Sequence, residues 1–407
     1  RALLVKCRFD EAEALALDML ATASDRDTVV GLYLLLLRVT GRSDEAETLA
    51  GENRFSTPEG YAHARGVMAN IHQDRGEWAA ADAAYVEAMH VTGQPGNMAK
   101  AYGVFLFRDG HYAEGAPHLA ERFNEQQRAQ VPLANATPEN LASLSRVIVM
   151  AEQGVGDQLA LLPLLRLAPL ADGAEVVFVA EDKFGPLLAG NTLGVSHFDR
   201  TVFLSEPQTM APNQLIYLGD LSRYLDGADP AARQGRYLLP DDARRAALRD
   251  TYTAAARGAP IYGLAWKSAS LIGHLRSVPL ADLLAVVPEG ATVVNLQYGD
   301  CADELAEAAR LRPDLTFIDD RTVDQMTDLS GFAAQISALD RVVTIDNTTA
   351  HMAGALGHPD THILIPAGAE CMWYWGRKAE RDPWYGTAHL HRQSVAGDWS
   401  SVLTGWR

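Results

Sequence analysis

Two segments of the chain place polar side chains directly between a strand-like run and a helix-like run. In one of them, residues 342–345 are rich in β-branched side chains, and an alanine-rich stretch containing His351 follows. The tetrad between them consists of Asp346, Asn347, Thr348 and Thr349. A helix beginning there would direct free backbone N–H groups and the positive end of its dipole at one point. The segment therefore predicts an anion site, and an N-capped helix whose histidine has its hydrogen-bond partners within the protein is the alternative.

The second segment lies upstream, where the strand-like run 147–150 enters a glycine-rich turn and then an apolar helix. The residues of this turn are Glu152, Gln153, Gly154, Gly156, Asp157 and Gln158. The glycine spacing approaches a dinucleotide fingerprint, but Leu159 stands where that fingerprint needs a small residue. An acidic side chain at the mouth of such a turn can act as a base in a cleft. The alternative is that Asp157 caps the helix.

Together, residues 152–157 and 346–357 resemble the paired signatures of glycosyltransferase family 9. This is the ADP-heptose:lipopolysaccharide heptosyltransferase group, which has bacterial relatives with tetratricopeptide repeats. The resemblance extends over residues 146–406. Other segments match in the same order: Trp266-Lys267, Arg276-Ser277, Leu296-Gln297 and the tail from Asp382 to Trp399. The resemblance implies a GT-B fold, with two Rossmann-like lobes around a cleft, and metal-independent, inverting transfer from a nucleotide sugar.

The resemblance also assigns roles to individual residues. It places the catalytic base at Asp157. In the absence of a metal ion, helix N–H groups, hydroxyls and cations must stabilise the leaving diphosphate. The expected donor-binding residues are Lys267, Arg276, Gln297, Tyr298, Asp346, Asn347, Thr348, Thr349 and His351. No metal ligand and no cofactor are expected, and the nucleotide sugar is a substrate. The acidic-lysine stretch of the heptosyltransferases is not reproduced, so the sugar stays open among hexose, heptose and nonulosonic acid.

Aromatic residues gather near the end of the chain: Trp373, Tyr374, Trp375, Trp384 and Tyr385. Aromatic side chains bury large areas and often lie where lobes meet. A packing role is therefore expected for most of this group. Part of the loop 370–375 follows a strand end and is a candidate for the rim of the donor pocket.

Composition limits the class of protein. The chain has 407 residues, which predicts two or three domains, and its net charge of −17 argues against binding to nucleic acid or an anionic membrane. Its three cysteines, Cys7, Cys301 and Cys371, form no C-x-x-C pair, so neither a disulfide framework nor a zinc site is expected. No apolar run is long enough to span a membrane. A cytoplasmic location is the resulting expectation.

The first third of the chain repeats with a helical-hairpin period. Similar hexapeptides begin at Cys7, Gly41, Gly76 and Gly110, and the offsets between them are 34, 35 and 34 residues. This is the period of tetratricopeptide repeats, in which each helix pair covers the apolar stripe of the next. We expect such an array over residues 1–127, binding an extended protein segment. The alternative is that the array only braces the rest.

The remaining chain alternates strand-like and helix-like runs. Residues 128–145 are expected to be a linker, residues 146–258 an acceptor-side lobe and residues 259–407 a nucleotide-sugar lobe. Predicted strands lie near residues 147–150, 175–180, 201–204, 214–218, 261–266, 292–297, 315–318, 341–345 and 361–366, and a helix is predicted over 241–256. Such alternation implies parallel sheets with sites at the carboxyl ends of strands.

Three functions are compatible with this organisation. The first is a glycosyltransferase that modifies a protein captured by the repeats, and the family precedent makes flagellin one such acceptor. The second is a transferase for a lipid-linked or polysaccharide acceptor, in which the repeats serve assembly. The third is a non-catalytic scaffold with a degenerate transferase fold.

Overall fold

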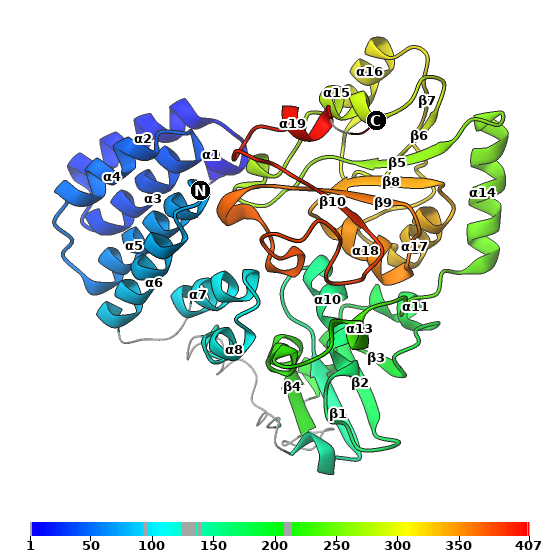
Figure 1. Ribbon diagram of the computed structural model, residues 1–407, viewed down its shortest axis with the longest axis horizontal. Helices are drawn as coiled ribbons and strands as arrows, with labels where there is room; N and C mark the ends of the chain where they lie inside the picture. The colour runs from blue at the N-terminus through cyan, green and yellow to red at the C-terminus, as the bar shows by residue number, and fades with distance from the viewer. Residues whose placement is uncertain are drawn as a thin grey trace.

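The computed structural model describes residues 2–92, 97–123, 136, 140–206, 214–404 and 406. Three parts follow one another along the chain: a helical array and two α/β lobes (Figure 1). Within the described residues, the first lobe holds a four-stranded sheet and the second a six-stranded sheet, both parallel. The predicted GT-B-like arrangement of two α/β lobes with parallel sheets is therefore confirmed.

The array consists of helical hairpins: α1 (Ala2–Val5) with α2 (Phe9–Thr22), α3 (Arg26–Val39) with α4 (Ser43–Glu52), α5 (Pro58–Asp74) with α6 (Trp78–Thr92), and α7 (Asn97–Arg108) with α8 (Tyr112–Ala120). The four aligned positions all have left-handed backbone, with φ of 52° at Cys7, 78° at Gly41, 75° at Gly76 and 80° at Gly110. After each of them, the next N–H group donates to a carbonyl five residues back: Arg8 to Leu3, Arg42 to Leu37, Glu77 to His72 and His111 to Leu106.

This shared turn is a Schellman-type helix end, which glycine favours because it has no Cβ. The predicted period is thus confirmed as a repeat of one helical hairpin. The assignment of these hairpins to the tetratricopeptide class stays a prediction.

The first lobe contains strands β1 (Arg146–Met150), β2 (Glu175–Ala180), β3 (Val195–Asp199) and β4 (Leu215–Tyr217), in the order β3-β2-β1-β4. Its helices are α10 (Val155–Leu161), α11 (Phe184–Leu188), α12 (Arg200–Ser205) and α13 (Pro230–Arg233), with 3₁₀ turns η1 (Leu141–Ser143), η2 (Leu162–Arg166) and η5 (Leu218–Leu225). The expected linker 128–145 lies largely outside the described residues.

The strand predicted near residues 201–204 is wrong. Strand β3 ends at Asp199, and the Asp199 carboxylate accepts the N–H of Val202 at 2.9 Å. This contact caps α12, which contains the predicted residues. The run therefore forms a helix despite its β-branched and aromatic composition, because a capped helix begins directly before it.

The second lobe contains strands β5 (Ile261–Ala265), β6 (Thr292–Asn295), β7 (Thr316–Ile318), β8 (Arg341–Ile345), β9 (Thr361–Ile365) and β10 (His389–Arg392), in the order β10-β9-β8-β5-β6-β7. Its helices are α15 (Leu280–Leu283), α16 (Ala302–Leu311), α17 (Leu329–Ser337), α18 (Thr348–Leu356) and α19 (Ser400–Leu403), with 3₁₀ turns η6 (Gly273–Leu275), η7 (Leu284–Val286), η8 (Gly368–Glu370) and η9 (Trp373–Trp375). The five strands predicted for this lobe are confirmed.

Helix α14 (Asp242–Ala256) connects the lobes and confirms the predicted helix at 241–256 (Figure 1). One hydrophobic core passes from lobe to lobe, since Leu159 and Ala160 of α10 belong to the same buried cluster as Ala350 and Ala353 of α18. In the part of the chain that the structure describes, no helix combines the length and apolar character needed to cross a bilayer.

Candidate active site

The turn after β1 positions Asp157 at the start of α10. Gln153 holds a left-handed conformation, with φ of 65°, although it is not glycine. Such backbone is costly for most residues and is found preferentially at functional sites. Asp157 Oδ2 accepts the Gly154 N–H at 3.2 Å, and Oδ1 accepts the Tyr374 hydroxyl at 2.9 Å. Both predicted roles are therefore compatible, because one carboxylate caps the helix and also faces the second lobe.

Burial dominates the electrostatics of Asp157 and raises its pKa above the ordinary aspartate value. The hydrogen bonds from Tyr374 and Gly154, and the positive charges of Lys100 and Arg276, act in the opposite direction. Lys100 belongs to α7 of the array, and Arg276 belongs to the second lobe. The carboxylate is thus surrounded by groups from all three parts of the protein.

A pocket of about 230 Å³ lies between the lobes beside this turn. Val155 and Lys183 line it from the first lobe. The opposite wall comes from the second lobe and includes Tyr298, Phe332, Asn347, Thr348 and Thr349. A pocket with mostly apolar walls and a few polar groups is the usual form of a small-ligand site.

The N-terminus of α18 forms the polar part of this wall. The Asn347 side chain caps the helix by accepting the Thr349 N–H at 2.9 Å, and Thr344 donates its hydroxyl to the same oxygen at 3.0 Å. A Cβ added to Gly156 would lie 3.1 Å from the His351 ring and 3.4 Å from Thr348 Cα. Glycine at position 156 therefore lets α10 approach the α18 N-terminus closely.

Asp346 and His351 are both buried under this wall. Asp346 accepts the Trp375 indole N–H at 2.7 Å and the Met372 N–H at 3.1 Å. The His351 ring stacks on Trp375 with centroids 5.0 Å apart, and its Nδ1 lies 3.1 Å from the Tyr385 hydroxyl. Burial lowers the pKa of His351 to about 3, so its imidazole is neutral. Neither Asp346 nor His351 is among the described residues that line the pocket.

Gln297 and Tyr298 follow β6 and have different surroundings. The buried Gln297 Oε1 accepts the N–H groups of Trp266 and Lys267, at 2.9 and 2.8 Å, and so joins the ends of β5 and β6. The Tyr298 hydroxyl accepts the Ala269 N–H at 2.7 Å, while the residue lines the pocket. Only Tyr298 of this pair is placed to meet a ligand.

The two predicted cations also differ. The Lys267 ammonium forms an ion pair with Glu304, outside the pocket lining. Arg276 donates to the Ser270 hydroxyl at 3.2 Å, and within the described residues its buried Nε has no hydrogen-bond partner. The positive charge of Arg276 acts on Asp157, Asp346 and His351. Neither side chain is among the described residues that line the pocket, and the unpartnered Nε makes Arg276 the better candidate of the two to meet a ligand charge.

Glu152 contacts the array and not the pocket. Its carboxylate accepts the Arg122 Nε–H at 2.7 Å and the Gly219 N–H at 2.7 Å. Arg122 also pairs with Asp220 at 2.7 Å. Gln158 is buried as well and donates to the Gln153 carbonyl at 3.2 Å. Of the predicted cleft-loop residues, Glu152 thus fastens the first lobe to the residues that follow α8.

Some neighbours of the site were missed at the sequence level. Lys183 and Lys100 belong to no recognisable sequence motif, and no spacing pattern distinguishes either of them. The aromatic group is placed between the lobes as expected, since Trp384 donates its indole N–H to the Ala160 carbonyl at 2.7 Å. The specific contact between Tyr374 and Asp157 joins residues 217 positions apart, which local pattern does not encode.

No protein-family model matches the chain. Protein FlbA from Caulobacter vibrioides is 27% identical over 358 residues, covering 81% of this chain and 58% of FlbA, so the chain spans less than two thirds of that relative. A family 9 glycosyl transferase from Veillonella parvula aligns with 61% of this chain and 86% of its own, at 13% identity and a TM-score of 0.44. The Escherichia coli ADP-heptose lipopolysaccharide heptosyltransferase II aligns over 64% and 94%, at 15% identity and a TM-score of 0.43.

Proposed function

We propose that the chain is a metal-independent, inverting glycosyltransferase that uses a nucleotide-sugar donor. The observation that carries this proposal is the pocket between the lobes, which has the α18 N-terminus on one side and the first turn of α10 on the other. That first turn also holds Asp157, a half-buried carboxylate of raised pKa. An anion-binding helix end beside a candidate base is what glycosyl transfer requires.

The donor is proposed to lie with its diphosphate at the start of α18. Thr348 and Thr349 offer hydroxyls at the positive end of the helix dipole. Lys183, which also pairs with Glu181 at 2.7 Å, offers positive charge in the pocket lining, and Arg276 adds positive charge from outside that lining. The nucleobase would lie against Tyr298 and the apolar side chains of Leu296 and Phe332. This arrangement stabilises negative charge on the leaving diphosphate without a metal ion.

In the proposed reaction, Asp157 accepts the proton of an acceptor hydroxyl as that oxygen attacks the anomeric carbon. The bond from that carbon to the diphosphate oxygen breaks, and the nucleoside diphosphate leaves with the electron pair. Attack on the face opposite the leaving group inverts the anomeric configuration. The Tyr374 hydroxyl holds the Asp157 carboxylate in place for the proton transfer.

The proposed acceptor is a protein. The array borders the candidate site, because Phe107 of α7 packs against Trp373, the neighbour of the Tyr374 that donates to Asp157. A chain bound along the helices would therefore be close to the reaction site. Flagellin as that acceptor, and a cytoplasmic location, rest on the family resemblance and the composition of the sequence. Transfer assays that offer purified flagellin, a lipid-linked saccharide and a polysaccharide in parallel test the acceptor class.

Calorimetric titration with UDP, GDP and ADP tests the donor proposal, and CMP, which carries a single phosphate, is the comparison. We expect one of these nucleotides to bind, and we expect both binding and transfer to be unchanged by EDTA, because the proposed site stabilises the diphosphate with hydroxyls, N–H groups and cations. A thermal shift with the same nucleotide provides an independent readout, since a ligand of the native state raises its apparent stability. A strict requirement for a divalent ion would contradict the proposed mechanism.

Thr349→Val is expected to weaken binding of that nucleoside diphosphate by about tenfold or more, because a hydrogen bond to a charged group contributes roughly 1.5–3 kcal/mol. Thr251→Val is the matched control, since the Thr251 hydroxyl only donates to the Ala247 carbonyl within α14. Calorimetry on both variants measures the difference. Unchanged affinity in Thr349→Val would move the diphosphate away from the α18 N-terminus.

A non-catalytic scaffold is the second candidate. The observation that favours it is the internal pairing of site groups, since Lys267 is neutralised by Glu304 and Asp346 is occupied by Trp375. A scaffold would bind nucleotide without turnover. Release of nucleoside diphosphate from a bound donor, measured with and without acceptor, separates the two functions.

A further inference from the structure

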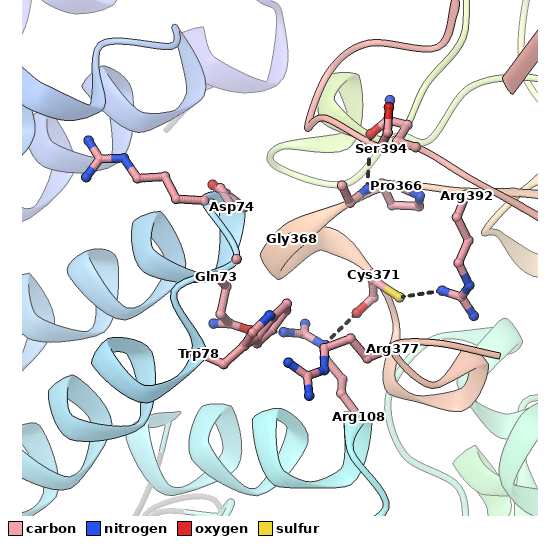
Figure 2. A pocket seen from close by; sticks show the side chains of 14 residues that line it. Gln73, Asp74, Trp78, Arg108, Pro366, Gly368, Cys371, Arg377, Arg392 and Ser394 are labelled. Atoms are coloured by element: carbon pink, nitrogen blue, oxygen red, sulfur yellow. Dashed lines mark hydrogen bonds between the residues drawn. The ribbon is translucent and has the colours of Figure 1, made fainter. Parts of the chain in front are cut away.

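Arg108, the last residue of α7, holds a segment of the second lobe. Its Nε donates to the Cys371 carbonyl at 2.7 Å (Figure 2). Its other two nitrogens donate to the Ala369 carbonyl and to the Gln73 side chain. The Arg108 carbonyl also accepts the Arg377 N–H at 3.0 Å. One buried arginine of the array thus contacts both ends of the loop 368–377.

Other groups of the array reinforce this contact. The Ala369 N–H donates to Asp74 Oδ1 at 2.9 Å, and Arg38 pairs with Glu370 at 2.9 Å. Gly368 has φ of 70°, and a Cβ added there would lie 2.2 Å from the Asp74 carboxylate. The loop is therefore fixed to the array by backbone as well as side-chain contacts.

The opposite side of the same loop faces the candidate active site. The Tyr374 hydroxyl donates to Asp157 at 2.9 Å, and the Trp375 indole donates to Asp346 at 2.7 Å. Tyr374 is three residues from Cys371, whose carbonyl Arg108 holds. Phe107 adds a packing contact, with its ring centroid 4.9 Å from that of Trp373.

We propose that Arg108 is a positioning residue for glycosyl transfer, which holds the loop 368–377 so that the Tyr374 hydroxyl stays on the Asp157 carboxylate. The array then completes the active site in addition to any acceptor it binds. This inference rests on the proposed function. It assigns Arg108 no contact with donor or acceptor.

The titration of Asp157 reports on this hydrogen bond. A hydroxyl that donates to a carboxylate favours its ionised form, so losing the Tyr374 contact raises the pKa of Asp157 further. The other groups that act on or lie near this carboxylate are the Gly154 N–H, Lys100, Arg276, Asp346 and the neutral His351. Lys100 shares α7 with Arg108, so Lys100→Met is needed to separate a direct charge effect from positioning.

Hydrogen exchange tests the structural step without requiring activity. In Arg108→Ala, the amides of Ala369, Met372 and Arg377 should exchange at least about tenfold faster than in the wild type. Arg75→Ala is the control, because Arg75 pairs with Asp44 and Glu47 inside the array. If Arg108→Ala does not fold, Asp74→Ala, which removes the acceptor of the Ala369 N–H, takes its place. Unchanged exchange over 368–377 would overturn the proposal.

The pH dependence of kcat tests the functional step. Tyr374→Phe should move the acid limb to higher pH by about half a unit or more, and Arg108→Ala should move it in the same direction. The acid limb of the double variant should lie at the same pH as that of Tyr374→Phe alone, because both changes remove the same hydrogen bond, from Tyr374 to Asp157. Three outcomes would overturn the proposal. The pH shifts of the two single variants could add in the double variant, or the acid limb of Arg108→Ala could stay at the wild-type pH. Lys100→Met could also shift the acid limb as much as Arg108→Ala does. A different result, full activity of Asp157→Asn, would contradict the proposed function itself.

Discussion

Asp157→Asn is expected to lower kcat for transfer by about 10²–10⁴-fold, the usual contribution of a general base. The amide keeps the size of the carboxylate and an oxygen for the Gly154 N–H, but it cannot take a proton. Affinity for the nucleoside diphosphate should change little, because Thr348 and Thr349 of α18 bind that group in the proposed complex. Steady-state kinetics and calorimetry on the same preparation measure both quantities.

Asp199→Asn provides the control, since Asp199 caps α12 in the same lobe through the Val202 N–H. This variant should keep wild-type kinetics. In the wild type, the ionised Asp157 is the active form, and burial raises its pKa. Activity should therefore fall with decreasing pH at a value above that of an ordinary aspartate. If Asp157→Asn kept more than about a tenth of the wild-type rate, Asp157 would be a helix cap only.

Arg122→Ala is expected to lower the free energy of unfolding by about 3–5 kcal/mol, because it leaves the buried Glu152 carboxylate and the partly buried Asp220 carboxylate without their cation. Glu152 is 7% exposed, and Arg122 joins it to Asp220. Urea denaturation followed by circular dichroism measures the change. Arg310→Ala is the matched control, since Arg310 forms an exposed pair with Glu307 and its loss should change the stability far less. Equal stability of the two variants would mean that Glu152 and Asp220 reach water when Arg122 is removed.

The elements that the sequence predicts well are those that local pattern determines. The runs at β1 and β8 are β-branched and enter polar turns, so the strand ends and the helices after them follow from periodicity. The repeat turns at Gly41, Gly76 and Gly110 follow from spacing, because each needs left-handed backbone. The run 201–204 has strand composition, but it lies in a helix that begins directly after the cap at Asp199.

The candidate site is predictable in its location and less so in its contacts. Thr348, Thr349 and Tyr298 line the pocket, whereas Glu152, Asp346 and Gln297 are held by partners inside the protein. These partners come from distant parts of the chain: Arg122 is 30 positions from Glu152, and Trp375 is 29 positions from Asp346. A polar residue at a strand end looks the same in the sequence whether it faces a ligand or a buried indole.

The close approach at Gly156 has a consequence for how such a protein can be rearranged. The side of α10 that meets α18 is shaped to its partner, with Gly156 against Thr348 and Tyr374 bonded to Asp157. An unrelated lobe placed on either side of this seam would meet a surface fitted to another partner and would leave apolar side chains such as Leu159 uncovered. Each lobe therefore packs well only against its own partner, although both have an α/β architecture with a parallel sheet. A new donor specificity is more readily reached by replacing pocket side chains than by exchanging a lobe.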